Sequence, residues 1–214
     1  MENAILVLDC GATNVRAVAV DRLGNLIASH SLPNTVHPDP WLPGGLTWDA
    51  DEIWQKFAAC SKAVTGNLGD FRIAAITVTT FGVDGAAMKK DGTLCYPVIS
   101  WQCNRTVPVM ENIGKYMPVS ALSAISGLQP FHYNTINKLI WLRENRPDVL
   151  NSTDYYVLMP SVFLHKLTGE FVTDATMAGT SMLTDLKNRN LSVEILSATG
   201  IKKNLFPPLV EPGT

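Results

Sequence analysis

The sequence predicts an α/β domain in which a mixed central sheet is flanked by helices. Three apolar or alternating runs at residues 5–9, 15–21 and 26–32 follow one another through tight polar connections, which predicts three short strands joined as hairpins. A helical pattern and a further β-branched strand come next in the chain. No helix directly follows the first strand, so the opening differs from a dinucleotide-binding strand-helix-strand unit.

The segment after these strands is rich in Pro and Gly and predicts an irregular loop over residues 33–46. A helix is expected to start at Asp49, because Asp49 and Glu52 have the spacing of a capping box. β-branched residues predict the next strand at 73–79. The apolar face of the helix consists of Ile53, Phe57, Val64 and Leu68.

The second half of the chain begins with an Asp91-Gly92 turn signal between residues 82–90 and 94–101, which predicts a β-hairpin. Helical periodicity follows from Val119 onward. The clearest helices are expected at 134–146 before Pro147, at 158–167 before Gly169, and at 192–198 before Gly200.

Composition favours small-molecule partners. The 214 residues are 46% hydrophobic and 17% charged, with a formal net charge of -2 and no basic cluster, which argues against partnership with nucleic acid or an anionic membrane. The apolar runs are too short to span a bilayer and the N-terminus lacks a signal-peptide pattern, so a cytoplasmic location is expected. The four cysteines lack zinc-ligand spacing, and four reduced, mostly buried thiols are expected.

The first strand ends in a small-residue turn that suits a phosphate group. Gly11 lets an anion approach the backbone, Thr13 and Asn14 can donate hydrogen bonds, and Arg16 adds positive charge. Asp9 could hold Mg²⁺, which prefers carboxylate and water ligands. The alternative is a tight hairpin with a polar tip, in which Asp9 only makes a turn.

A second group of polar and aromatic residues suits a sugar. Asp84 follows the strand at 73–79 and can accept hydrogen bonds from sugar hydroxyls. Trp101 can pack on the apolar side of a sugar ring, and Arg105 can donate hydrogen bonds. The alternatives are a turn carboxylate for Asp84 and a core position for Trp101.

These segments together resemble a known family. Asp-x-Gly-x-Thr-x-x-Arg at 9–16 resembles the first phosphate motif of the actin, chaperone and sugar kinase superfamily. With Asp84 and the Trp-Gln-x-x-Arg-Thr block at 101–106, the chain resembles the FGGY carbohydrate kinases over essentially all 214 residues. The resemblance implies a ribonuclease H-like (actin-like ATPase) fold, with residues 1–214 as the N-terminal domain.

The resemblance also implies ATP and Mg²⁺ as cofactors and transfer of the ATP γ-phosphate to a ketose. Residues 7–17, 78–86, 167–171 and 176–181 resemble the L-fuculose-phosphorylating members, which form L-fuculose 1-phosphate. Tyr133 joins the sugar site by the same resemblance, His132 less so, while Lys138 is expected only to cap or solvate its helix. Three further residues are expected to be structural: Asp174, Thr176 and Thr180.

The resemblance places no catalytic base in this chain. The base Asp, the second phosphate loop and the adenosine pocket are implied to belong to a C-terminal domain absent from these residues, so the chain alone is expected to be inactive. An exposed domain interface would favour a homodimer or aggregation.

Several alternatives stay open. The substrate could be rhamnulose, xylulose or glycerol, because related kinases share the architecture. A non-catalytic sugar-binding module would have no need of Asp9, Thr13 and Arg16. An actin-like or chaperone-like ATPase would not be expected to carry the block at 101–106.

Overall fold

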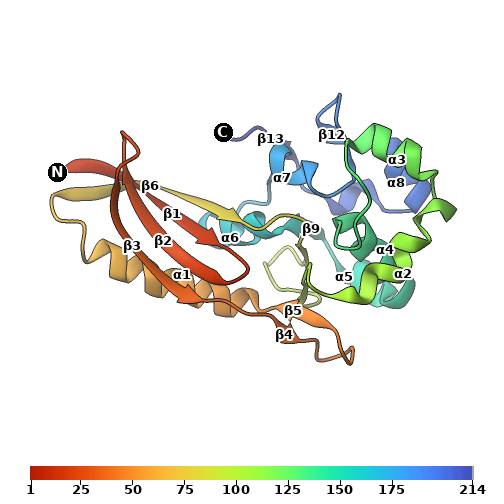
Figure 1. The fold of residues 1–214 in the computed structure, drawn as a ribbon, viewed down its shortest axis with the longest axis horizontal. Coiled ribbons are helices and arrows are strands. Elements are labelled where there is room, and N and C mark those ends of the chain that lie inside the picture. The colour runs from red at the N-terminus through yellow and green to blue at the C-terminus, as the bar shows by residue number, and fades with distance from the viewer. Residues whose placement is uncertain (214) are drawn as a thin grey trace. The chain divides into compact units, whose positions relative to one another are not determined.

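The three predicted opening strands form a continuous antiparallel meander in the computed structural model, which describes residues 1–213 (Figure 1). They are β1 (Glu2–Cys10), β2 (Asn14–Asp21) and β3 (Leu26–Pro33). The predicted fourth strand is β6 (Phe71–Thr80), which pairs parallel to β1 and completes a sheet in the order β3-β2-β1-β6. The prediction of a mixed sheet is confirmed.

One face of this sheet is covered by the predicted helix, α1 (Ala50–Thr65). Asp49 caps it as expected, because its carboxylate accepts hydrogen bonds from the backbone N–H groups of Asp51 and Glu52, both at 2.9 Å. Glu52 does not complete the capping box, since its carboxylate pairs with His37 and Lys56 instead. The buried apolar residues of the helix and the sheet include Leu6, Leu8, Val15, Ala17, Ile53, Phe57 and Val64.

The chain divides into two compact units, although the sequence predicts one domain. Unit 1 comprises residues 1–37 and 49–81, and unit 2 comprises residues 38–48 and 82–213. Unit 2 has its own core, which includes Ile99, Leu122, Ile136, Leu139, Ile140, Met182 and Ile195. Assignment of residues 1–214 to a single domain stays a prediction.

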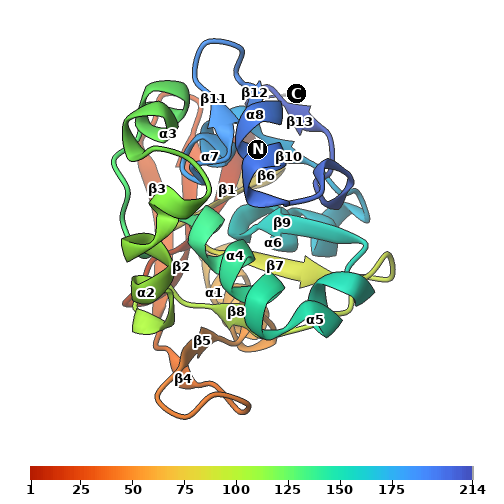
Figure 2. The same ribbon diagram turned by 90° about the vertical axis from the view of Figure 1, so that its right-hand side faces the viewer.

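The predicted hairpin around Asp91-Gly92 is only partly correct. The turn exists, since Lys89 N–H donates to the Thr93 carbonyl at 2.9 Å. Beside the turn, Met88 and Leu94 form an antiparallel bridge, as predicted. Further away, β7 (Gly85–Met88) pairs with β9 (Tyr155–Leu158), as Figure 2 shows, and β8 (Val98–Ile99) pairs with β5 (Leu46–Trp48). These buried strands pair with strands far away in the sequence, and a local turn signal does not reveal such partners.

The predicted helices of the second half are confirmed. They are α4 (Thr135–Asn145), α6 (Met159–Thr168) and α8 (Val193–Thr199). Gly169 and Gly200 end α6 and α8 with φ of 80° and 67°, a conformation that glycine adopts without strain. The remaining helices are α2 (Val107–Glu111), α3 (Val119–Ser126), α5 (Pro147–Ser152) and α7 (Ala175–Gly179), with 3-10 turns at Asn104–Thr106, Ile113–Lys115 and Lys203–Leu205.

The remaining strands are short: β4 (His37–Pro38), β10 (Thr173–Asp174), β11 (Thr184–Asp185), β12 (Asn190–Leu191) and β13 (Leu209–Val210). The cysteines are free, and those at 10, 60 and 103 are buried. Across residues 1–213, no helix combines the length and apolarity needed to cross a membrane. The same residues contain no group of three His, Cys, Asp or Glu side chains that could hold a metal ion.

Candidate functional site

The turn after β1 is fixed by backbone and amide hydrogen bonds. Gly11 N–H donates to the Asn14 carbonyl at 2.8 Å. Asn34, buried just beyond β3, donates from Nδ2 to the Gly11 carbonyl at 2.9 Å and from its backbone N–H to the Thr13 carbonyl at 2.8 Å. Asn34 lies 23 residues from Gly11, so no local motif in the sequence identifies it. The predicted phosphate turn is therefore a pre-formed structure.

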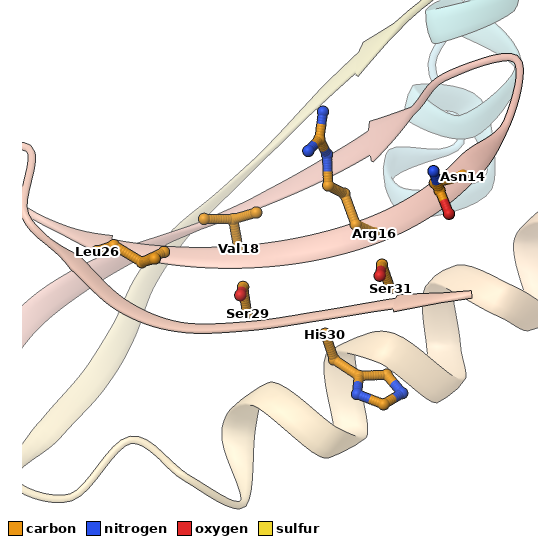
Figure 3. A pocket seen from close by; sticks show the side chains of 7 residues that line it. All are labelled: Asn14, Arg16, Val18, Leu26, Ser29, His30 and Ser31. Atoms are coloured by element: carbon orange, nitrogen blue, oxygen red, sulfur yellow. The ribbon is translucent and has the colours of Figure 1, made fainter. Parts of the chain in front are cut away.

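Asp9 and Arg16 lie opposite each other in the β1–β2 ladder and form an ion pair. The Arg16 side chain is 56% exposed. In Figure 3 its guanidinium stands above the sheet with the Ser29 and Ser31 hydroxyls on the same side, and these residues line an open pocket together with Asn14. A guanidinium beside hydroxyl and amide donors suits a phosphoryl group.

The donor set also fits the predicted magnesium ion. Asp9 supplies one carboxylate at the mouth of the turn, and its side chain retains 22% exposure. Mg²⁺ commonly uses one or two carboxylates, with waters and phosphate oxygens filling its other positions. Asp9 is thus suited to a metal that arrives with a phosphorylated ligand.

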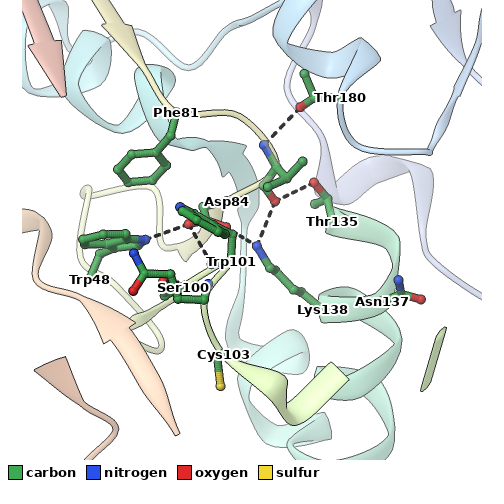
Figure 4. A network of polar contacts seen from close by, with 12 residues as sticks. Trp48, Phe81, Asp84, Ser100, Trp101, Cys103, Thr135, Asn137, Lys138 and Thr180 are labelled. Carbon is green, nitrogen blue, oxygen red and sulfur yellow. Dashed lines mark hydrogen bonds and ion pairs between the residues drawn. The ribbon is translucent and has the colours of Figure 1, made fainter. Parts of the chain in front are cut away.

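Asp84 lies at the centre of a buried polar network in unit 2 (Figure 4). Its side chain is 0% exposed and forms an ion pair with Lys138 of α4. Its Oδ2 atom also accepts hydrogen bonds from the Trp48 indole N–H at 2.7 Å and from the Trp101 backbone N–H at 3.1 Å. Burial raises the pKa of Asp84, while the Lys138 charge and these hydrogen bonds act in the opposite direction.

The expectation that Lys138 only caps or solvates its helix is wrong. Its side chain is 1% exposed, and Nζ reaches both Asp84 and the Val83 carbonyl, the latter at 3.1 Å. Burial lowers the pKa of Lys138, and the Asp84 charge opposes that shift. The first two turns of α4 are buried on all sides, so a lysine between apolar residues of this helix was the available sequence signal.

Aromatic rings surround the Trp101 segment. Trp101 meets Tyr133 edge to face with ring centroids 6.4 Å apart, and Tyr133 stacks on Phe131 at 5.1 Å. His132 also meets Tyr133 edge to face. Trp101 and Tyr133 are partly exposed, and Phe131 is exposed. The structure thus brings the two predicted aromatic sugar contacts together on one surface.

Arg105 has a partner that no motif in the sequence identifies. Its buried guanidinium pairs with the buried carboxylate of Asp39 at 2.7 Å and also donates to the Tyr96 hydroxyl at 3.3 Å. Burial raises the Asp39 pKa, but hydrogen bonds from the Trp41 backbone, Tyr96 and Arg105 outweigh it, so this pKa lies below its ordinary value. Sugar binding by Arg105 stays a prediction.

The comparison with family models decides the family. The model of the FGGY family of carbohydrate kinases, N-terminal domain, matches residues 4–214. The chain belongs to the FGGY family of carbohydrate kinases. Among curated FGGY relatives, it is 48% identical over 216 residues to L-fuculokinase from Escherichia coli K12, and 30% identical over 217 residues to glycerol kinase from Thermococcus gammatolerans.

The matches cover 99% of this chain but only 45% of the L-fuculokinase and 43% of the glycerol kinase. Among solved structures, gluconate kinase from Lactobacillus acidophilus superposes with a TM-score of 0.89 at 23% identity, covering 99% of this chain and 42% of that one. This likeness establishes the fold, which is that of the actin-like ATPases, as predicted. The chain spans about half the length of the relatives it matches.

Proposed function

We propose that this chain is the sugar- and phosphate-binding N-terminal part of an ATP-dependent ketose kinase whose acceptor is L-fuculose. The observation that carries the proposal is the aromatic surface of Trp101 and Tyr133, which is joined to the buried Asp84–Lys138 pair through the Trp101 backbone. The identity with L-fuculokinase, 48% against 30% for glycerol kinase, favours L-fuculose among the acceptors of the family.

The sugar site combines apolar and polar groups, as carbohydrate recognition requires. Trp101 and Tyr133 present ring surfaces to the apolar side of a sugar. Within residues 1–213, no hydrogen bond involves the Trp101 indole N–H or the Tyr133 hydroxyl, so both remain available to a ligand. Direct hydrogen bonding of the sugar to Asp84 stays a prediction, because Asp84 is 0% exposed behind the Trp101 backbone.

In unit 1, the proposed ligand is the phosphate chain of ATP. Arg16 and Asn14 would donate to phosphoryl oxygens, and the Gly11 turn would allow close approach of the backbone. Asp9 would hold Mg²⁺, which supplies positive charge to the phosphates when bound. Thr13 stays a predicted contributor through its hydroxyl.

The groups that complete the reaction are proposed to lie in the C-terminal part of the whole kinase. Phosphoryl transfer needs a base that accepts the hydroxyl proton, and we assign none to residues 1–214. The proposed partner of this chain is therefore the C-terminal domain of the same protein, with a homodimer as the alternative. The proposed location is the cytoplasm, where ATP is available.

A panel of ligands tests the substrate assignment. We expect L-fuculose to raise the melting temperature of the chain more than L-rhamnulose, D-xylulose or glycerol at equal concentration, because a ligand that binds only the folded state stabilises it. Trp101→Leu should abolish this increase. The matched control is Trp41→Leu, since Trp41 is 61% exposed and lies outside the aromatic surface, and it should keep the increase.

Two outcomes would contradict the assignment. A larger increase with glycerol or D-xylulose would identify a different acceptor. No increase with any of the four ligands, confirmed by calorimetric titration, would contradict sugar binding by this chain.

A further inference from the structure

Val83, directly before Asp84, has an unusual backbone conformation. Its φ is +62°, in the left-handed region that β-branched residues rarely adopt. Asp84 N–H donates to the Gly82 carbonyl at 2.8 Å, which closes a three-residue turn centred on Val83. Turns of this kind with a positive central φ are rare and strained. Strain beside a candidate ligand site points to a functional constraint.

Side chains on α4 and just beyond α7 hold this turn on both sides (Figure 4). The Val83 N–H donates to Thr180 Oγ1 at 3.1 Å, just beyond α7. The Val83 carbonyl accepts from Thr135 Oγ1 at 2.8 Å and from Lys138 Nζ at 3.1 Å, both on α4. Both polar groups of the strained residue are therefore bound by side chains.

Thr180 is itself oriented for this contact. Its hydroxyl donates to the Met177 carbonyl at 2.9 Å, which leaves oxygen lone pairs for the Val83 N–H. Its methyl group also lies 3.2 Å from the position that a Cβ on Gly82 would take. The sequence alone indicates only a stabilising role for Thr180 in its segment.

The turn determines where the Asp84 carboxylate lies. Downstream, the Asp84 carbonyl accepts from Met159 N–H at 3.0 Å, and β7 begins at the next residue. Upstream, the strained turn sets the direction in which the chain enters Asp84. Lys138 contacts both the Val83 carbonyl and the Asp84 carboxylate, and that carboxylate binds the Trp101 backbone. Displacement of the turn would therefore displace Trp101.

We propose that Thr180, Thr135 and Lys138 are positioning residues. They hold Val83 in its strained conformation and so orient Asp84 and Trp101 for the sugar. The proposal rests on the function proposed above. None of the three side chains needs to touch the sugar, because each acts through the Val83 peptide or the Asp84 carboxylate.

Calorimetric titration of the chain with L-fuculose tests this role through Thr180. Thr180→Val keeps the methyl group and removes the hydroxyl, and should raise the dissociation constant about fivefold, which corresponds to one hydrogen bond of about 1 kcal/mol. Thr180→Ser keeps the hydroxyl and should stay within about twofold of the wild type. Thr65→Val, which removes an exposed hydroxyl from α1, should change nothing.

Repeating the titration in a Val83→Gly variant distinguishes a positioning role of Thr180 from general destabilisation. Val83→Gly relieves the strain, because glycine adopts positive φ readily. In that background Thr180→Val should change the dissociation constant less than about twofold, since the turn no longer depends on the hydroxyl. An unchanged affinity in Thr180→Val, or an equal loss in both backgrounds, would overturn the proposal.

The wild-type titration distinguishes this inference from the proposed function. Absence of L-fuculose binding by the wild-type chain would contradict the proposed function and, with it, this inference. Wild-type binding that Thr180→Val leaves unaffected would contradict the inference alone.

Discussion

The stability of unit 2 depends on single residues that form a buried ion pair. Asp84 and Lys138 are 0% and 1% exposed, and loss of either partner leaves the other charge buried without compensation. We expect Lys138→Met to lower the free energy of unfolding by about 3–5 kcal/mol in urea denaturation. The double variant Asp84→Asn/Lys138→Met should recover most of this loss, because no buried charge remains.

Lys62→Met is the matched control, since Lys62 is exposed in the last turn of α1. Its effect should stay within about 0.5 kcal/mol, as for most surface substitutions. A loss below about 1 kcal/mol for Lys138→Met would contradict the buried-pair interpretation.

Asp39 gives a pH-dependent prediction. Its folded-state pKa lies below its ordinary value, so its ionisation adds stability above the unfolded-state pKa near pH 4. That contribution is lost as the pH falls through the folded-state pKa. The difference in free energy of unfolding between wild type and Asp39→Asn should therefore be constant from neutral pH to about pH 5 and shrink below about pH 4. A difference that stays constant to about pH 2.5 would be inconsistent with this account.

The sequence identified several site residues but not their partners. Asp84 and Trp101 stand out because each lies in a motif with its own chemistry. Lys138, Trp48 and Asp39 carry no such local signal, since their partners are 54, 36 and 66 positions away, respectively. Contacts at such separations depend on tertiary packing, which spacing within a motif does not encode.

At the level of elements, the sequence predicts features that depend on neighbouring residues better than features that depend on residues far away in the chain. The N-cap of α1 and the C-caps of α6 and α8 lie next to the helices that they cap. The sequence located all three correctly. The hairpin predicted around Asp91-Gly92 is confirmed next to the turn, where Met88 and Leu94 form an antiparallel bridge. Further from the turn, β7 pairs with β9 and β8 pairs with β5. A turn signal specifies the turn but not the long-range partner of a buried strand.

The pairing of β7 with β9 depends on Gly85. A Cβ at this position would lie 2.6 Å from the Tyr156 ring and 2.7 Å from the Val157 carbonyl oxygen. The carbonyl belongs to the backbone of the partner strand and cannot rotate away. We expect Gly85→Ala to lower the free energy of unfolding by about 1–3 kcal/mol or more, measured by urea denaturation.

Gly114→Ala is the control, because no atom lies within 4 Å of a Cβ placed there. It should leave stability unchanged or raise it by less than about 1 kcal/mol. Equal effects of the two substitutions would show that close packing between β7 and β9 is not what requires glycine.

For the whole molecule, the family is better determined than the activity. The motif at 9–16, Asp84 and the block at 101–106 sufficed to predict the FGGY family and its fold. The chain spans about half the length of its relatives, and we propose that the groups that complete the reaction lie in the other half. We therefore assign ligand binding to this chain and the catalytic base to the rest of the proposed kinase.

The most direct test of this division is one preparation of the chain examined in two ways: calorimetric titration with L-fuculose, and a coupled assay for ADP release with ATP, Mg²⁺ and L-fuculose. The account predicts binding of L-fuculose without ADP release. ADP release above the background of an Asp9→Asn variant would contradict it, because a catalytic base would then lie within these 214 residues. Failure to bind L-fuculose would contradict the sugar site itself.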